Sequence, residues 1–354
     1  MRTLHLCGEN RNMKTDLKGL DTQETEEWVK ELGMEKYRAG QIRQWIFSKL
    51  AVSFDDMTNV SKSVRELLKE KANISHLETV KTQVSEDTTE KFLFKLKDGE
   101  LIESVLIPEK DHYTICISSQ VGCAMGCRFC LTAQQGFKRN LTSAEIIEQI
   151  IHVRCSMDDP VKLTNIVLMG MGEPLANYYN VLKAVNNIIA NDGMSFSHRK
   201  VTLSTSGLVP QIRQLGQDSL INLAVSLNAV DDETRSFLMP VNRKYPLKSL
   251  VSALKEYPLP NRKKITFEYI LINGINDRDE DAHGLIRLLS GIKSKVNLIP
   301  FNTSPGLEMA APSPEKINQF RDILVNNNLT AIIRKSKGQD ISAACGQLSG
   351  EHSA

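Results

Sequence analysis

The sequence of 354 residues has no long apolar run, few aromatic residues and almost balanced charges. No apolar run approaches the roughly 18 residues that a membrane-spanning helix requires, so we expect no membrane association. Residues 1–10 contain no apolar h-region of the kind found in secretory signals, so we do not expect secretion. Aromatic residues make up 6% of the chain, too few to indicate a stacking platform for single-stranded RNA.

The formal net charge of +2 neither demands nor excludes a nucleic-acid partner, because binding to a large anion would depend on local patches. Short basic runs occur at residues 138–139, 198–200, 262–264 and 334–337. Phosphate contact and ordinary solvated surface are both open for each of them. The seven cysteines are odd in number and three are clustered, which argues against a secreted disulfide framework. We therefore expect a reducing compartment and a cytoplasmic protein.

Three of these cysteines carry the strongest chemical signal. Cys123, Cys127 and Cys130 form a C-x-x-x-C-x-x-C triplet directly after a strand-like stretch. The triplet supplies three thiolates, one fewer than a closed iron–sulfur or zinc site needs. On a four-iron cluster, three ligands leave one iron open to hold a cofactor and pass it an electron. The alternative is a zinc site completed by a fourth Cys or His, but no such ligand lies nearby in the sequence.

Hydrophobic periodicity divides the chain into three parts. Residues 22–71 have apolar residues at helical spacing, and residues 77–118 read as short strands. Beyond the triplet, strands and helices alternate repeatedly, as in parallel α/β folds. We expect an α/β protein with a partial, open parallel βα barrel, a small N-terminal helical domain and a β-rich connecting segment. An ordinary doubly wound sheet is the structural alternative.

The same patterns predict the domain boundaries. We expect a disordered leader (1–20), a helical RNA-binding domain (21–75), a β-rich connector (76–112), the barrel with its Cys345 loop (113–348) and a tail (349–354).

Polar residues follow the ends of several expected barrel strands, where parallel α/β folds gather their functional groups. Gly172 would allow close backbone approach, and Glu173 could accept hydrogen bonds from an ammonium group. Each residue alone also fits an ordinary turn or helix start. Together they indicate a ring of partners for a polar cofactor: Gly172, Glu173, Ser204, Ser226, Leu227, Asn228 and Asn302.

In combination, these motifs resemble those of the RlmN-type radical S-adenosylmethionine (SAM) enzymes. The similarity runs in order from about residue 20 to residue 348 and rests on the triplet and on residues 132–141, 170–175, 199–207, 297–302 and 343–348. It implies that Cys123, Cys127 and Cys130 hold a 4Fe–4S cluster whose open iron binds SAM. It also implies methylation of carbon-2 of an adenine in 23S rRNA and tRNA. Asn228 departs from the pattern, since His is more frequent there.

The resemblance also assigns roles to two outer cysteines and a carboxylate. Carbon-2 of adenine is electron-poor, so the methyl group has to arrive by radical chemistry. In the family, Cys345 takes a methyl from SAM as S-methylcysteine, and the resulting methylene radical adds to the adenine. Cys116 is the resolving thiol, which leaves a transient Cys116–Cys345 disulfide. Glu103 matches the position of the proton acceptor, a role also given to Cys116. Without the resemblance, Glu103 would be an ordinary strand carboxylate and Cys345 an inert thiol.

Two other functions stay open at this point. One is the related resistance enzyme that methylates carbon-8 of the same adenine, and the other is a non-catalytic iron–sulfur RNA-binding protein. The motifs at 133–137, 172–174 and 299–302 favour the carbon-2 enzyme. We further expect the target base to swing into the barrel, a reductant such as flavodoxin or ferredoxin, and a monomeric protein.

Overall fold

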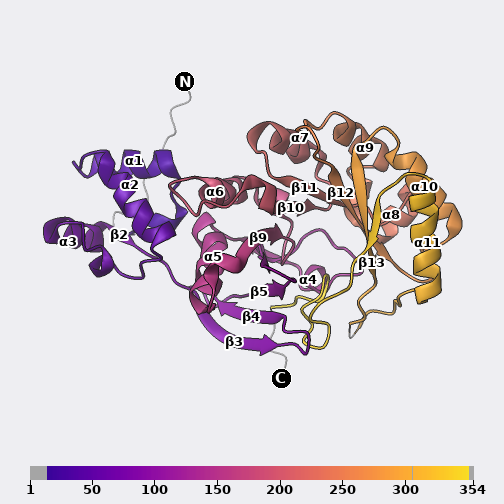
Figure 1. Cartoon of the computed structure of the whole chain (residues 1–354), viewed down its shortest axis with the longest axis horizontal. Helices are drawn as coiled ribbons and strands as arrows, with labels where there is room; N and C mark the ends of the chain where they lie inside the picture. The colour runs from indigo at the N-terminus through magenta and orange to yellow at the C-terminus, as the bar shows by residue number, and fades with distance from the viewer. Residues whose placement is uncertain (1–13, 305, 351–354) are drawn as a thin grey trace.

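The computed structural model describes residues 14–304 and 306–350 and is built around one ten-stranded sheet (Figure 1). The strand order is β14-β13-β12-β11-β10-β9-β6-β5-β4-β3. Its strands are β3 (Glu78–Val84), β4 (Glu90–Lys95), β5 (Leu101–Pro108), β6 (Tyr113–Cys116), β9 (Leu163–Leu168), β10 (Val201–Thr205), β11 (Asn222–Ser226), β12 (Ile265–Leu271), β13 (Ser294–Pro300) and β14 (Ala331–Ile333).

The strands from β6 to β14 pair in parallel and follow one another in chain order. Each crossover therefore returns the chain to the next position in the sheet, without the reversal of strand order that defines a doubly wound fold. Strand β14 forms one edge of the sheet. At the other end of the parallel series, β6 pairs with β5 and not with β14, so the barrel does not close. The prediction of a partial, open parallel barrel is confirmed, and the doubly wound alternative is wrong.

Helices cover one face of the parallel strands. They are α5 (Ser143–Ser156), α6 (Tyr178–Ile189), α7 (Val209–Asp218), α8 (Asp232–Leu238), α9 (Leu247–Lys255), α10 (Asp279–Leu289) and α11 (Pro314–Asn326). Figure 1 shows α7, α9, α10 and α11 on the outer side of the strands. Strand β10 alternates buried Val201, Leu203 and Thr205 with half-buried Thr202 and Ser204. Because strand side chains alternate between faces, the apolar face packs under the helices and a more polar face lines the barrel interior.

The β-rich connector extends the barrel sheet instead of forming a separate layer. Strands β3, β4 and β5 are antiparallel, and β5 pairs with β6. Residues 96–100 join β4 and β5 into a hairpin, in which Lys95 lies opposite Leu101. The sheet thus runs without interruption from the connector to β6, the first of the parallel strands.

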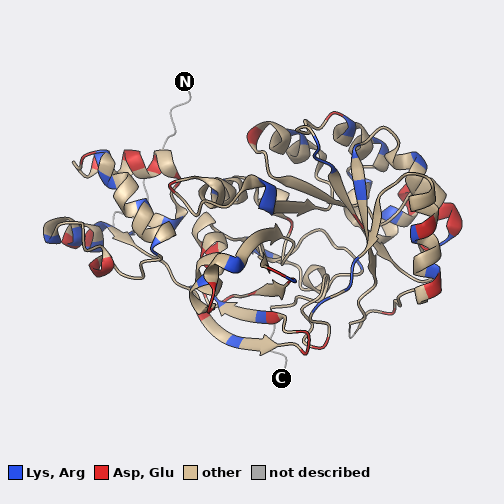
Figure 2. Ribbon diagram, in the orientation of Figure 1, with Lys and Arg blue, Asp and Glu red and all other residues tan. Residues whose placement is uncertain are grey.

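The N-terminal module contains α1 (Thr22–Glu31), α2 (Tyr37–Arg43) with a π-helical continuation (Gln44–Ser48), and α3 (Lys62–Lys71). Figure 2 shows charges of both signs along α1 and α3. A correction concerns the leader, of which residues 1–13 lie outside the described residues. Residues 15–19 are ordered, because β1 (Thr15–Asp16) pairs with β2 (Ala72–Asn73) and the Leu17 side chain is buried. Lys18 is also buried, and its Nζ bonds the Ser75 carbonyl and the Glu148 carboxylate of α5.

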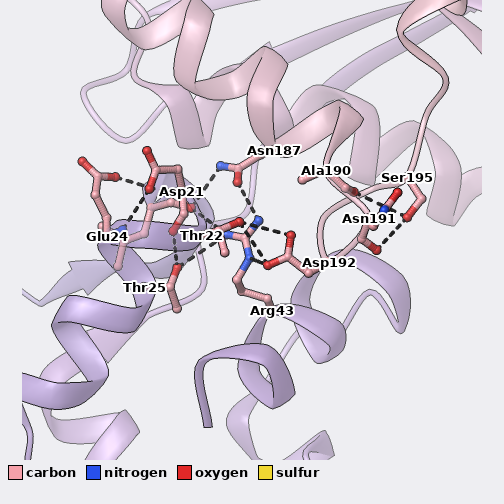
Figure 3. A network of polar contacts seen from close by, with 11 residues as sticks. Asp21, Thr22, Glu24, Thr25, Arg43, Asn187, Ala190, Asn191, Asp192 and Ser195 are labelled. Atoms are coloured by element: carbon pink, nitrogen blue, oxygen red, sulfur yellow. Dashed lines mark hydrogen bonds and ion pairs between the residues drawn. The ribbon is translucent and has the colours of Figure 1, made fainter. Parts of the chain in front are cut away.

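A second polar network fastens the module to the end of α6 (Figure 3). The buried Arg43 of α2 donates from Nε to Asp192 Oδ2 (2.8 Å) and from Nη2 to Asn187 Oδ1 (2.9 Å). Its Nη1 also donates to the Leu20 carbonyl (3.1 Å), which in turn accepts from Asn187 Nδ2 (3.0 Å). Thr22 Oγ1 adds contacts to the Asp192 carboxylate. Arg43 therefore joins three chain segments at once and fixes the module against the barrel domain.

Replacing Arg43 with methionine is expected to lower the free energy of unfolding by about 2–3 kcal/mol, because buried acceptors lose a charged donor. Urea titration followed by circular dichroism measures this change. Arg38→Met is the matched control, because Arg38 is half-buried and its hydrogen bond goes to Gln41 of the same helix, and this variant should stay within about 0.5 kcal/mol of the unaltered protein. Equal stability of the two variants would contradict the docking role of Arg43.

Candidate functional site

The cysteine triplet lies in the loop of a short hairpin. Strand β7 (Gln120–Gly122) pairs with β8 (Phe137–Asn140), and Cys123 directly follows β7. A short helix, α4 (Leu131–Gln134), begins after Cys130. Gly122 has φ +70°, and a Cβ atom there would lie 1.8 Å from the Gly136 carbonyl oxygen. Only glycine therefore allows the two strands to close behind the triplet.

The three thiols of the triplet share one protected environment. The pKa of Cys123 is raised to about 12, chiefly by burial and to a smaller extent by the neighbouring Cys130 thiol and Glu173 carboxylate. Burial also raises the pKa of Cys127 well above its ordinary value, with Cys130, Cys123 and Glu173 adding to the effect. The thiols thus lie close enough for the negative charge of one thiolate to oppose ionisation of the next. A bound cationic centre would remove this repulsion, as in a metal-binding site.

This donor set fits an iron–sulfur cluster better than zinc. Zinc needs about four ligands around one ion. Within residues 14–304 and 306–350, no three His, Cys, Asp or Glu residues are grouped as ligands of a single metal ion. A four-iron cluster instead takes its thiolates on separate irons, which suits three thiols spread along one loop. Cys123, Cys127 and Cys130 are the residues that would hold it.

Glu173 lies beside the triplet and is held rigidly. Its side chain is buried; Oε1 accepts from Leu175 N (3.0 Å) and Oε2 from Ser206 N (2.7 Å). Burial raises its pKa, although the bonds to Ser206 partly oppose that shift. Gly172 has φ +99°, and a Cβ there would meet Gln120 at 2.5 Å. The glycine therefore brings the Glu173 segment against β7, close to the triplet.

The predicted residues at the other strand ends differ in their surroundings. Ser204 and Ser226 are half-buried, Leu227 is fully buried, and Asn302 is nearly so. Asn228 adopts φ +59° and is also fully buried, with its Oδ1 accepting from Ile270 N (2.8 Å) and its Nδ2 donating to Met239 Sδ (3.2 Å). Its amide is thus occupied by the fold, and its cofactor contact stays a prediction.

The chain segment around Cys345 folds back over the triplet. Figure 1 shows this C-terminal part returning to the centre of the molecule beside α4. Leu131 N donates to the Gly346 carbonyl (2.8 Å), and Thr132 Oγ1 donates to the Leu348 carbonyl (2.6 Å). Asn302 Nδ2 donates to the Cys345 carbonyl (3.1 Å). These bonds fix the Cys345 loop between the cysteine triplet and the end of β13.

Cys345 and Cys116 are brought into one neighbourhood from opposite ends of the barrel sequence. Burial raises the pKa of Cys116 far above its usual range, and the Cys345 thiol raises it further. Cys345 keeps accessible surface, but the surrounding protein withdraws its thiol from bulk water and raises its pKa to about 11. Both thiols are free in the structure. The transient disulfide predicted between them during the reaction therefore stays a prediction.

Glu103 is buried on β5, and both of its carboxylate oxygens have partners. Its Oε1 pairs with Lys91 Nζ of β4 at 3.0 Å. Its Oε2 accepts from Ser349 N (2.7 Å) and Gly350 N (3.0 Å). The sequence assigns 349–354 to a separate tail, but these bonds attach its first two residues to the sheet.

Three buried charged residues near the site were missed by the sequence analysis. Arg235 donates to the Ser206 (2.7 Å), Ser226 (3.1 Å) and Leu227 (3.0 Å) carbonyls, so it ties two strand ends together near Cys127. The other two are Lys91 and Glu268. Glu268 is the single charged residue of its apolar strand, which is a signal that sequence reasoning could have used, whereas Lys91 lies between Glu90 and Phe92 in a strand with two other charged residues.

Comparison with known proteins extends this picture to nearly the whole chain. The ribosomal RNA large subunit methyltransferase N-terminal domain matches residues 15–74, and the radical SAM superfamily matches residues 117–286. The dual-specificity RNA methyltransferase RlmN of Syntrophus aciditrophicus is 53% identical over 338 residues, covering 96% of this chain and 97% of that protein. Its namesake in Desulfosudis oleivorans is 54% identical over 326 residues, covering 92% and 88%.

A crystal structure of a radical SAM methyltransferase from Sphaerobacter thermophilus has a TM-score of 0.90 and 43% identity, covering 95% of this chain and 100% of that one. The chain belongs to the RlmN family. As a member it is a radical SAM RNA methyltransferase, and its cofactors are a 4Fe–4S cluster and SAM. The resemblance inferred from the motifs is confirmed. None of the helices within the described residues is both long and apolar enough to cross a membrane.

Proposed function

We propose that this RlmN-family enzyme methylates carbon-2 of adenine in 23S rRNA and tRNA through an S-methylcysteine on Cys345. The observation that carries the proposal is the seating of the Cys345 loop against the cysteine triplet, through the bond from Leu131 N to the Gly346 carbonyl. The names of the relatives, which describe a dual-specificity RNA methyltransferase, support two RNA substrates. An iron–sulfur protein that only binds RNA would have no use for a thiol held in this place.

The metal-binding and cofactor-binding assignments belong to the same proposal. Cys123, Cys127 and Cys130 hold the cluster, which with SAM supplies a 5′-deoxyadenosyl radical. Glu173, beside the triplet, would accept hydrogen bonds from the amino group of SAM, and Ser204, Ser226 and Asn302 at the strand ends would offer hydrogen bonds to its other polar groups. We propose that Gly172, Leu227 and Asn228 contact SAM through their backbone atoms. This arrangement supports SAM binding at the carboxyl ends of the strands, as in other parallel α/β enzymes.

The two outer thiols divide the remaining chemistry. The Cys345 thiol loses its proton, takes the methyl group and later carries it to the adenine as a methylene. The ring radical must then give up one electron, which returns to the redox centre, and one proton, which Cys116 or Glu103 accepts. The Cys116 thiolate attacks the Cys345 sulfur and breaks the bond between that sulfur and the new carbon. That carbon keeps the bonding electron pair and takes up a proton to become the methyl group, and a Cys116–Cys345 disulfide is left. The shared neighbourhood of the two thiols supports this pairing.

The partners follow from the same chemistry. The ordered N-terminal module (about residues 15–75) is proposed to grip RNA, and it is followed by the connector and barrel, which share one sheet. A small reductant such as flavodoxin or ferredoxin supplies the electron and later reduces the disulfide. We propose that the enzyme acts as a monomer in the cytoplasm, where thiols stay reduced and RNA is available.

Nucleoside analysis tests the proposal directly. The full chain is reconstituted anaerobically with iron and sulfide and incubated with reductant, methyl-labelled SAM and unmodified fragments of 23S rRNA and tRNA. Mass spectrometry should find labelled 2-methyladenosine in both RNAs. If 8-methyladenosine were the only product, the protein would be the related resistance enzyme that methylates carbon-8. Absence of both 5′-deoxyadenosine and methylated RNA would identify a protein that only binds RNA.

A further inference from the structure

We propose that Glu103 and Lys91 form a clamp that holds both stems of the Cys345 loop, and that Glu103 is a positioning residue. The inference rests on the proposed function of Cys345 as methyl carrier. It assigns Glu103 a role different from that of the proton acceptor, which the family pattern suggests for this position.

The two residues form one buried unit on neighbouring strands. Glu103 of β5 lies opposite Leu93, and Lys91 of β4 lies opposite Val105, so the two side chains are diagonal neighbours on the same face of the sheet. The opposite face carries Ser104, whose Oγ bonds Gln149 of α5 (2.7 Å). The charged pair therefore points away from α5 and toward the C-terminal segment.

Each charge of the pair takes one stem of the loop. The ammonium of Lys91 donates to the Ser342 carbonyl (3.4 Å), three residues before Cys345. The carboxylate of Glu103 accepts from the amides of Ser349 and Gly350, which follow Cys345. Charge-assisted bonds to backbone groups are among the stronger hydrogen bonds in proteins. The pair thus closes the base of the loop, while α4 and Asn302 hold its tip.

This geometry leaves Glu103 poorly placed to accept a proton. A general base needs a lone pair within reach of the proton that it removes. Glu103 is 1% exposed, and its two oxygens already accept from the Lys91 ammonium and two amides. Within the proposed function, removal of the ring proton then falls to Cys116.

Hydrogen exchange of the reconstituted full chain tests the clamp. In Glu103→Gln, backbone amides of residues 338–350 should exchange at least about tenfold faster than in the unaltered enzyme. The initial rate of Cys345 methylation by SAM, measured by peptide mass spectrometry, should fall at least fivefold with an unchanged KM for SAM. Lys91→Met should give the same pattern, because either change opens the same base.

The control is Lys95→Met on the same strand, which removes an exposed pair with Glu78 and should leave both readouts unchanged. Because a single buried charge without its partner can prevent folding, the double variant Lys91→Met with Glu103→Leu removes both charges and should still show the faster exchange. Unchanged exchange in the double variant would overturn the clamp.

A Glu103→Gln enzyme that exchanges normally, methylates Cys345 at the normal rate and then accumulates a protein–RNA adduct would establish the proton-acceptor role and overturn the clamp. Failure of the unaltered enzyme to methylate Cys345 would reject the proposed function. The exchange measurement would still decide on the clamp, because it depends on no methyl transfer.

Discussion

Cys345→Ala should abolish labelled methyl transfer from SAM both to the protein and to RNA, with a loss of at least about a thousandfold. Alanine is close in size to cysteine but lacks the sulfur that we propose carries the methyl group. The bonds that seat the loop use backbone atoms of Gly346 and Leu348 and should survive the change. Gel autoradiography of protein and RNA after incubation with methyl-labelled SAM measures both transfers.

Cys155→Ala is the matched control, since Cys155 is an exposed free thiol on α5 outside the site. It should retain normal transfer to protein and RNA. Iron and sulfide analysis should give equal cluster contents for the two variants, because neither thiol belongs to the triplet. RNA methylation by Cys345→Ala would show that the methyl reaches adenine without a protein carrier.

Cys116→Ala should instead stop the reaction after carbon–carbon bond formation. Cys345 still takes its methyl and the methylene still adds to adenine, but no thiol remains to break the bond between sulfur and the new carbon. The RNA therefore stays attached to the protein through Cys345. A denaturing gel should show a band that contains both protein and RNA and that nuclease treatment shifts back toward the free protein.

The double variant Cys116→Ala with Cys345→Ala controls for non-specific crosslinking and should give no such band. Normal turnover of Cys116→Ala, with free methylated RNA as product, would contradict the resolving role of Cys116. It would also require another reductant for the thioether linkage.

Much of the fold follows from local patterns in the sequence. The helical spacing over residues 22–71 corresponds to α1, α2 and α3, and the short strands expected over residues 77–118 are β3, β4, β5 and β6. Hydrophobic periodicity reports these elements because each buries one face. It says nothing of pairing between distant segments, so the attachment of the connector to β6 was not foreseen. The ordered structure of residues 15–19 was missed for the same reason. A lysine is normally exposed, and Lys18 is buried because it pairs with Glu148, which is distant in the sequence.

In the site, too, residues that are close in sequence could be predicted and contacts between distant residues could not. The cysteine triplet can be read from spacing alone, because its ligands are close in sequence. The clamp on the Cys345 loop cannot, because Lys91 and Ser342 are far apart in the chain and meet only in the folded protein. Arg235 has no spacing signal either, since its partners are backbone carbonyls at strand ends.

The fastening of the N-terminal module by Arg43 and Lys18 has a consequence for substrate choice. If the module grips RNA, the separation between that grip and the catalytic pocket is a fixed length. Two RNAs of unrelated sequence can then serve the same enzyme only where each presents its target adenine at that same separation from a second contact. Any adaptation to the two RNAs would then have to come from bending of the RNA, because Arg43 and Lys18 hold the module against the barrel domain.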